Sequence, residues 1–232
     1  MKFRVLLCIV LFLPQAVVGN AIAADTVGLW DRFEKAVLSD KDYDDPYRDV
    51  ALNVTYTKPD SSIIKFWGFH DGGSRWIIRF MPDQLGRWKY EADFSDGSPG
   101  ISGVFTCVES HLPGMVSKDE SNPIWFGYKG GAHELIRSFH VGDRFFAANW
   151  PDKDRKRFLD WAGGQGYNML SIASHYLNRD SQGRGKSWDT PALWNEAERS
   201  PDPREYHKAE VILDDLATRR ILVYPFAGFF GR

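Results

Sequence analysis

The residues best suited to chemistry lie at or beyond the ends of predicted strands in the second half of the chain. Two end the apolar run 145–150 and four lie in the long connection 175–200: Asn149, Trp150, His175, Tyr176, Trp188 and Trp194. Aromatic faces stack on the apolar faces of ring-shaped ligands such as sugars, and amide, phenol and imidazole groups add hydrogen bonds. We therefore predict that these residues form a ligand-binding wall. In the alternative interpretation, the connection is a lid whose aromatic side chains pack on the protein.

Other motifs give weaker signals. The acidic run 39–45 begins like a calcium loop, but it has no glycine at the sixth position, and Ala51 stands where a bidentate Glu is needed. It is therefore interpreted as a solvated turn. The sequence contains no phosphate-binding glycine loop, Cys/His metal cluster or nucleophile elbow. We predict no cofactor and no metal.

The elements that would position the predicted wall alternate between strand and helix. Apolar strands are predicted at 145–150, 167–173 and 221–227, with helices over 152–162 and from Pro203 onward. Glycines at 163–166 end the first helix, and Asp202-Pro203 is a typical helix start. This order is typical of a parallel α/β fold. An open three-stranded parallel sheet would leave apolar faces uncovered, so we predict the first three strands of a (β/α)8 TIM-type barrel. A small, complete α/β domain is the alternative.

The first half of the chain has a different period. Apolar and polar residues alternate over 50–56, 75–80 and 88–94, and turn-forming residues separate these runs. Short alternating strands between turns are typical of an antiparallel β-sandwich of the Ig-like kind. The predicted organisation is an Ig-like sandwich at 25–110, a connector at 111–140 and a partial barrel at 141–232.

The N-terminal residues predict export. Lys2 and Arg4 precede an apolar stretch, and Ala21-Ile22-Ala23 forms an A-x-A cleavage pattern, so residues 1–23 are interpreted as a signal peptide. No later apolar run is long enough to span a membrane. Loss of this leader would lower the net charge from −2 to about −4 without leaving a basic block, which argues against a nucleic-acid partner. It would also leave Cys107 as the only thiol.

Runs in both halves resemble known families. They are Asn53-Val54-Thr55, Gly68-Phe69-His70-Asp71-Gly72, Trp76-Ile77-Ile78-Arg79-Phe80, Gly86-Arg87-Trp88, Gly166-Tyr167-Asn168 and the run 224–231. The earlier runs resemble an N-terminal domain of unknown function that precedes catalytic barrels in bacterial glycoside hydrolases. The later ones resemble the opening strands of apiosidase-like (β/α)8 barrels. Asn149-Trp150 departs from the Asp-Thr-Ala-Trp ending expected of the first barrel strand.

The resemblance implies an exported bacterial glycoside hydrolase that acts on a polysaccharide or oligosaccharide, located in the periplasm or outside the cell. Glycosidic hydrolysis requires two facing carboxyl groups. In such barrels they come from later strands, so the resemblance assigns no catalytic residue to this chain, which looks like an N-terminal fragment. The alternative function is a non-catalytic module that binds carbohydrate or a cell surface.

Overall fold

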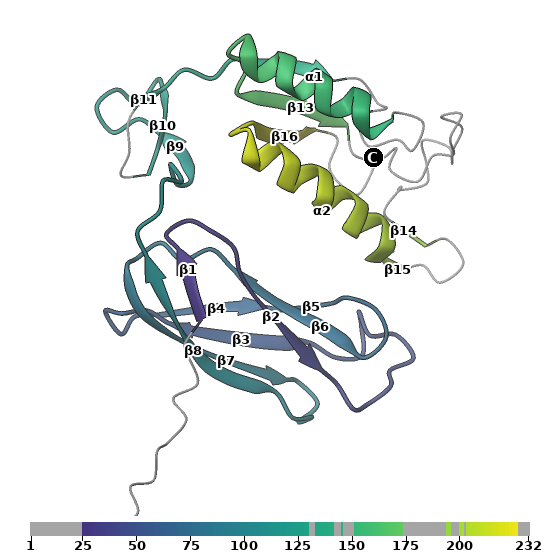
Figure 1. Cartoon of the computed structure of the whole chain (residues 1–232). Helices are drawn as coiled ribbons and strands as arrows, with labels where there is room; N and C mark the ends of the chain where they lie inside the picture. Colours follow the sequence, from purple (N-terminus) through teal and green to yellow (C-terminus); the bar gives the residue numbers. More distant parts are fainter. Residues whose placement is uncertain are drawn as a thin grey trace, which may run out of the picture.

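The computed structural model describes residues 25–129, 133–141, 145, 151–173, 194–195, 200–201 and 203–226. β-Strands predominate, and two helices accompany them. Figure 1 shows a two-sheet unit formed by residues 25–108 and an α/β unit formed by residues 138–226. A small sheet lies along the chain between them.

The two-sheet unit contains a larger and a smaller sheet. The five-stranded sheet has the order β1-β8-β7-β3-β4, with bounds β1 Asp25–Gly28, β3 Leu52–Thr57, β4 Ile63–Trp67, β7 Gly86–Phe94 and β8 Ile101–Val108. The three-stranded sheet has the order β2-β6-β5, with bounds β2 Phe33–Leu38, β5 Phe69–His70 and β6 Arg75–Phe80. β1 is parallel to β8, and the other neighbouring strands of these two sheets are antiparallel.

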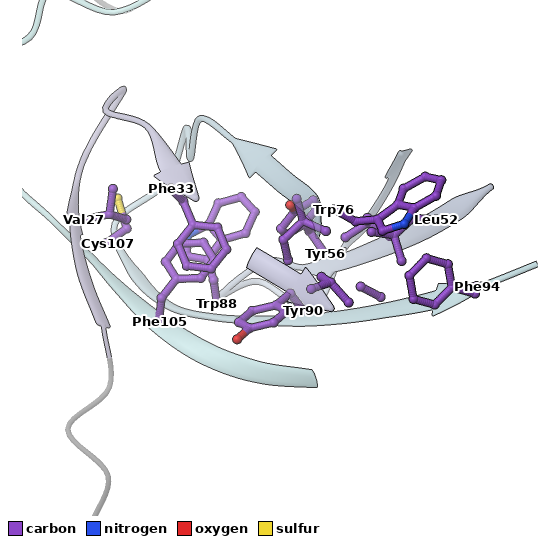
Figure 2. Close-up of a cluster of buried hydrophobic side chains, with 14 of the residues drawn as sticks. Val27, Phe33, Leu52, Tyr56, Trp76, Trp88, Tyr90, Phe94, Phe105 and Cys107 are labelled. Atoms are coloured by element: carbon purple, nitrogen blue, oxygen red, sulfur yellow. The ribbon is translucent and has the colours of Figure 1, made fainter. Parts of the chain in front are cut away.

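An aromatic core joins the two sheets. Phe33 of β2 stacks on Phe105 of β8 with ring centroids 4.0 Å apart, and Trp88 of β7 stacks on the same Phe105 at 5.8 Å (Figure 2). Tyr56 of β3 stacks on Phe80 of β6 at 4.3 Å. Leu52, Tyr56 and Trp88 are buried, as the alternation in the sequence predicted, and Phe105 is buried as well. Large aromatic side chains supply much of the apolar area that stabilises this unit.

Strand β6 departs from simple alternation. Trp76 and Ile78 face the core as expected, but Ile77 between them is also buried. Arg79 lies on the same face as Ile77 and bonds to Glu210 of helix α2 (Pro203–Thr218). The α/β unit therefore covers the outer face of β6 around Arg79, whereas Arg75 on the same face is 52% exposed.

The connector, predicted to be rich in loops, contains a small antiparallel sheet. Its order is β11-β10-β9, with bounds β9 Val116–Lys118, β10 Phe126–Tyr128 and β11 His133–Glu134. The buried Asp119 carboxylate accepts hydrogen bonds from the Ser121 hydroxyl (2.5 Å) and from the backbone N–H groups of Ser121 and Asn122. His133 Nδ1 lies 3.1 Å from its other oxygen. These bonds lower the pKa of Asp119 to about 2, the Ser121 hydroxyl contributing most.

The α/β unit has the predicted parallel arrangement. Its sheet has the order β12-β13-β16, with bounds β12 Ser138–Val141, β13 Met169–Ala173 and β16 Leu222–Phe226. Helices α1 (Asp152–Gly164) and α2 (Pro203–Thr218) connect these strands, and β14 (Trp194–Asn195) pairs with β15 (Ser200–Pro201). Both sheet pairs are parallel. The predicted helices are therefore confirmed, and so are the second and third strands.

The first strand of this sheet lies earlier in the chain than the predicted strand 145–150. Ser138–Val141 pairs with β13, whereas Phe145 lies in a turn and residues 146–150 are outside the described part. Phe145 is fully buried in the core of the α/β unit. The apolar side chain of Phe145 is therefore explained by burial and not by strand pairing. A short apolar run in a sequence cannot distinguish these two causes.

Candidate functional site

The ligand-binding wall predicted from the sequence lies almost wholly outside the described residues. This applies to Asn149, Trp150, His175, Tyr176 and Trp188. Trp194 is placed only as part of β14, without its side chain. The wall therefore stays a prediction.

A cleft that the sequence did not indicate lies between the two units. Its volume is about 870 Å³, within the range of about 300–1,000 Å³ typical of ligand sites. The two-sheet unit contributes aromatic side chains from the turn before β2 and from β4 and β5. Segment 112–115, the C-terminal half of α2 and the start of β16 complete the lining. The cleft therefore combines residues that are far apart in the sequence.

Helix α2 positions one side of the cleft because it has two functional faces. Ala209, Ile212 and Leu216 pack into the core of the α/β unit. The opposite face contacts the outer surface of the β2-β6-β5 sheet, and Figure 1 shows α2 facing the two-sheet unit. Polar contacts across this boundary include Arg32 with Asp214, Arg79 with Glu210, and His207 with Asp71.

Arg79 links the two units most directly. Its Nε donates to Glu34 Oε2 at 2.7 Å, and its Nη1 donates to Glu210 Oε1 at 2.7 Å. The guanidinium also lies 5.1 Å from the centre of the Phe69 ring, within cation–π range. Burial lowers the pKa of Arg79, but the hydrogen bonds to Glu210 and Glu34 outweigh it and raise the pKa overall.

Arg32 and Asp214 form the second link. The Arg32 guanidinium donates from both Nη atoms to the two Asp214 oxygens, at 3.0 and 3.1 Å. This bidentate geometry is the strong form of such a pair. The bond to Asp214 raises the pKa of Arg32. Both pairs lie at the cleft and connect α2 to the two-sheet unit.

Trp30 has an unusual backbone conformation. Its φ is +66°, a left-handed conformation that is uncommon for a bulky residue, and its N–H donates to the Pro82 carbonyl at 2.9 Å. Gly114 has φ +91°, and a Cβ there would lie 3.0 Å from Trp30 Nε1. The indole therefore lies close to the bare backbone of Gly114. Strained backbone of this kind is characteristic of functional positions.

Exposed aromatic side chains form another part of the lining. Phe66 and Trp67 lie at the end of edge strand β4 with ring centroids 6.0 Å apart, and Trp67 is 66% exposed. The sequence signal for them is slight. The run 63–67 is apolar but lacks the clean alternation of its neighbours, which is the only hint that both of its faces carry large side chains.

The lining of this cleft suits binding, because apolar and aromatic side chains make up most of it. Of the two carboxylates in the lining, Asp214 is ion-paired with Arg32, and Asp31 Oδ1 accepts the Arg32 backbone N–H at 2.7 Å. Within the described ranges, no group of three or more His, Cys, Asp or Glu side chains could hold a metal ion. Nor does any helix there have the length and apolar character needed to cross a membrane.

Comparisons with known proteins agree with this architecture. Residues 26–95 match a family model described as a domain of unknown function, DUF5060. No curated protein matches the chain. The crystal structure of a putative glycoside hydrolase from Bacteroides vulgatus superimposes with a TM-score of 0.69 and 22% identity, over 86% of this chain. The chain spans 40% of the length of that protein. A putative α-amylase from Salmonella typhimurium reaches a TM-score of only 0.28 at 12% identity, covering 84% of this chain and 30% of that one.

The first structural match shows a shared fold. At this identity it shows nothing more, but the fold is one found in a protein described as a glycoside hydrolase. The match extends beyond the DUF5060 segment and so includes the α/β unit. The chain therefore shares the fold of that protein over most of its length, and its residues 26–95 match the DUF5060 model.

Proposed function

We propose that this chain is the N-terminal portion of an exported bacterial glycoside hydrolase that acts on polysaccharide. In this proposal the two-sheet unit is an Ig-like accessory sandwich, and the α/β unit is the start of a (β/α)8 barrel. The two catalytic carboxylates would come from later barrel strands. The observation that carries the proposal is the fold shared with the Bacteroides protein, over 86% of this chain but only 40% of that one.

The arrangement of the α/β unit supports the barrel interpretation. Its three strands are parallel and sequential, and α1 and α2 connect them. The predicted site residues Asn149 and His175 follow the C-terminal ends of β12 and β13, where barrel enzymes carry their active sites. Phe66 and Trp67, by contrast, belong to the accessory unit.

A second candidate function is a non-catalytic carbohydrate-binding module. The aromatic cleft favours it, because a lining of mostly apolar and aromatic side chains suits binding. The two candidates differ in what the gene encodes after Arg232.

The test is to determine the coding sequence beyond Arg232 and assay both products. We expect an open frame that adds further β/α units with Glu or Asp at the strand ends. The longer product should release reducing sugars from at least one polysaccharide, whereas the 232-residue chain should not. A stop codon directly after Arg232 would instead favour the binding module, and hydrolysis by the 232-residue chain would refute the assignment of the carboxylates.

A further inference from the structure

We infer that the cleft between the two units binds a neutral oligosaccharide, with Trp30 and Trp67 as its stacking platforms. The inference deepens the proposed function, because it names a ligand class and a second surface for it. It rests on the volume of the cleft, the aromatic character of its lining and the balance of its charges.

The aromatic side chains of the lining suit the faces of sugar rings. A pyranose presents an apolar C–H face for a ring to cover and hydroxyl groups around its edge. The cleft offers Trp30 and Trp67 for the face, and Asp31 and Arg220 as acceptor and donor for the edge. Asp31 Oδ1 accepts the backbone N–H of Arg32 at 2.7 Å, and each carboxylate oxygen has a second lone pair with which to accept a bond from a hydroxyl group. In the described part of the chain, no ion pair involves Asp31 or Arg220.

The charges of the cleft favour a neutral ligand. Arg32 is neutralised by Asp214, and Arg79 lies between Glu34 and Glu210. The remaining pair, Asp31 and Arg220, carries opposite signs. An acidic sugar needs a surplus of cations, and a cationic ligand needs a surplus of anions. The cleft and its ion-pair partners carry three cations and four anions, which is no large surplus of either sign.

The position of the cleft separates it from the predicted wall. Its lining includes Arg220 and residues Ile221–Val223, where β16 begins. The C-terminal ends of the parallel strands, which precede the wall residues, lie at the other end of the sheet. A polysaccharide chain held here would contact the protein at a surface additional to the strand ends.

The test measures binding by the 232-residue chain. Affinity electrophoresis in gels containing hydroxyethylcellulose, xylan, galactomannan, starch or polygalacturonate identifies the polysaccharide class. Isothermal titration with the corresponding hexasaccharide then gives Kd. We expect retardation by at least one neutral polymer and none by polygalacturonate. Retardation by polygalacturonate alone, or by no polymer, would overturn the inference.

Variants locate the binding. Trp67→Ala removes a side chain that is 66% exposed, so the fold should tolerate it, and we expect Kd to rise roughly tenfold or more. Trp30→Ala should act in the same direction. Trp161→Ala is the matched control, because Trp161 is 52% exposed on α1 and does not line the cleft. An unchanged Kd for Trp67→Ala, or an equal loss for Trp161→Ala, refutes the cleft as the site.

The outcomes separate this inference from the proposed function. If the longer product hydrolyses a polysaccharide but the 232-residue chain binds none of the neutral polymers, the enzyme assignment stands and the cleft assignment fails. If the 232-residue chain binds through Trp67 and the reading frame ends at Arg232, the cleft assignment stands and the enzyme assignment fails.

Discussion

The contact between Arg79 and Glu210 allows the docking of the two units to be tested by a double-mutant cycle. Arg79→Met keeps the length of the side chain and removes its charge. Glu210→Gln keeps the shape of the partner. The cycle compares both single variants with the double variant and isolates the energy of the pair, because effects common to the singles cancel.

The structure sets the expected magnitude. The Arg79 and Glu210 atoms are 2.7 Å apart, and both side chains are about one-third exposed, at 31% and 29%. Charge centres about 4 Å apart attract by about 1–4 kcal/mol between the dielectric limits of water and a protein surface. Partial exposure places the pair near the lower limit, so we expect a coupling of about 1 kcal/mol. Arg79→Met alone should cost about 2 kcal/mol, because it also removes the hydrogen bond from Arg79 to Glu34.

The assay is urea unfolding of the four proteins at low ionic strength. The matched control is a second cycle on Asp154 and Arg157, an i,i+3 pair on α1 with an N–O distance of 3.2 Å. Its side chains are 42% and 78% exposed, so its coupling should lie near about 0.3 kcal/mol. If the two cycles give equal coupling energies, the contact between Arg79 and Glu210 does not stabilise the docking of the two units, contrary to our expectation.

Three further predictions test the packing and the turns. Phe105→Ala empties a fully buried ring position and should cost about 3–5 kcal/mol in urea unfolding; a loss below about 1 kcal/mol would contradict the described core. Gly114→Ala should destabilise the protein by about 1 kcal/mol and alter its tryptophan fluorescence. Gly163→Ala, in open space on α1, should instead stabilise the protein by up to about 1 kcal/mol. Equal effects of the two substitutions would argue against the close approach of Trp30 to Gly114. Asp119 has a pKa lowered to about 2 in the folded protein, so its ionised form stabilises above about pH 4 and this contribution is lost as the pH falls toward 2. Asp119→Asn should therefore be destabilising at pH 5 but much less so at pH 2.5. A difference in the free energy of unfolding between the variant and the original protein that does not change with pH would refute this prediction.

Local signals in the sequence predicted most of the regular elements. The alternation at 52–56 and 88–94 placed β3 and β7 correctly, because one face of each strand must bury its side chains. Helices α1 and α2 followed from glycine and proline signals at their ends. These features depend on a few neighbouring residues, which is why the sequence alone was sufficient.

Pairing between distant segments was harder to predict. Strand β12 was missed because Ser138–Val141 is short and only weakly apolar, and its pairing with Met169–Ile172 of β13 has no local signature. The strand was predicted to begin at Phe145 instead, because a buried apolar residue in a turn cannot be distinguished from a strand residue by its type alone. The connector sheet was missed for the same reason, because its strands have two or three residues each.

The cleft could not be predicted from the sequence because the elements that form it have the same apolar and polar pattern as elements with a solvent-exposed face. Arg79 is an outward residue of an alternating strand, and a charged side chain there predicts contact with water. Its partner Glu210 lies 131 residues further along the chain, on the polar face of an amphipathic helix. An interface held by ion pairs therefore leaves the amphipathic pattern of both elements unchanged. Two features of the cleft are not explained by this amphipathic pattern. They are the positive φ of Trp30 and the apolar edge strand that ends at Trp67. Both line the cleft, which is why these two residues are the ones on which the binding inference should be tested first.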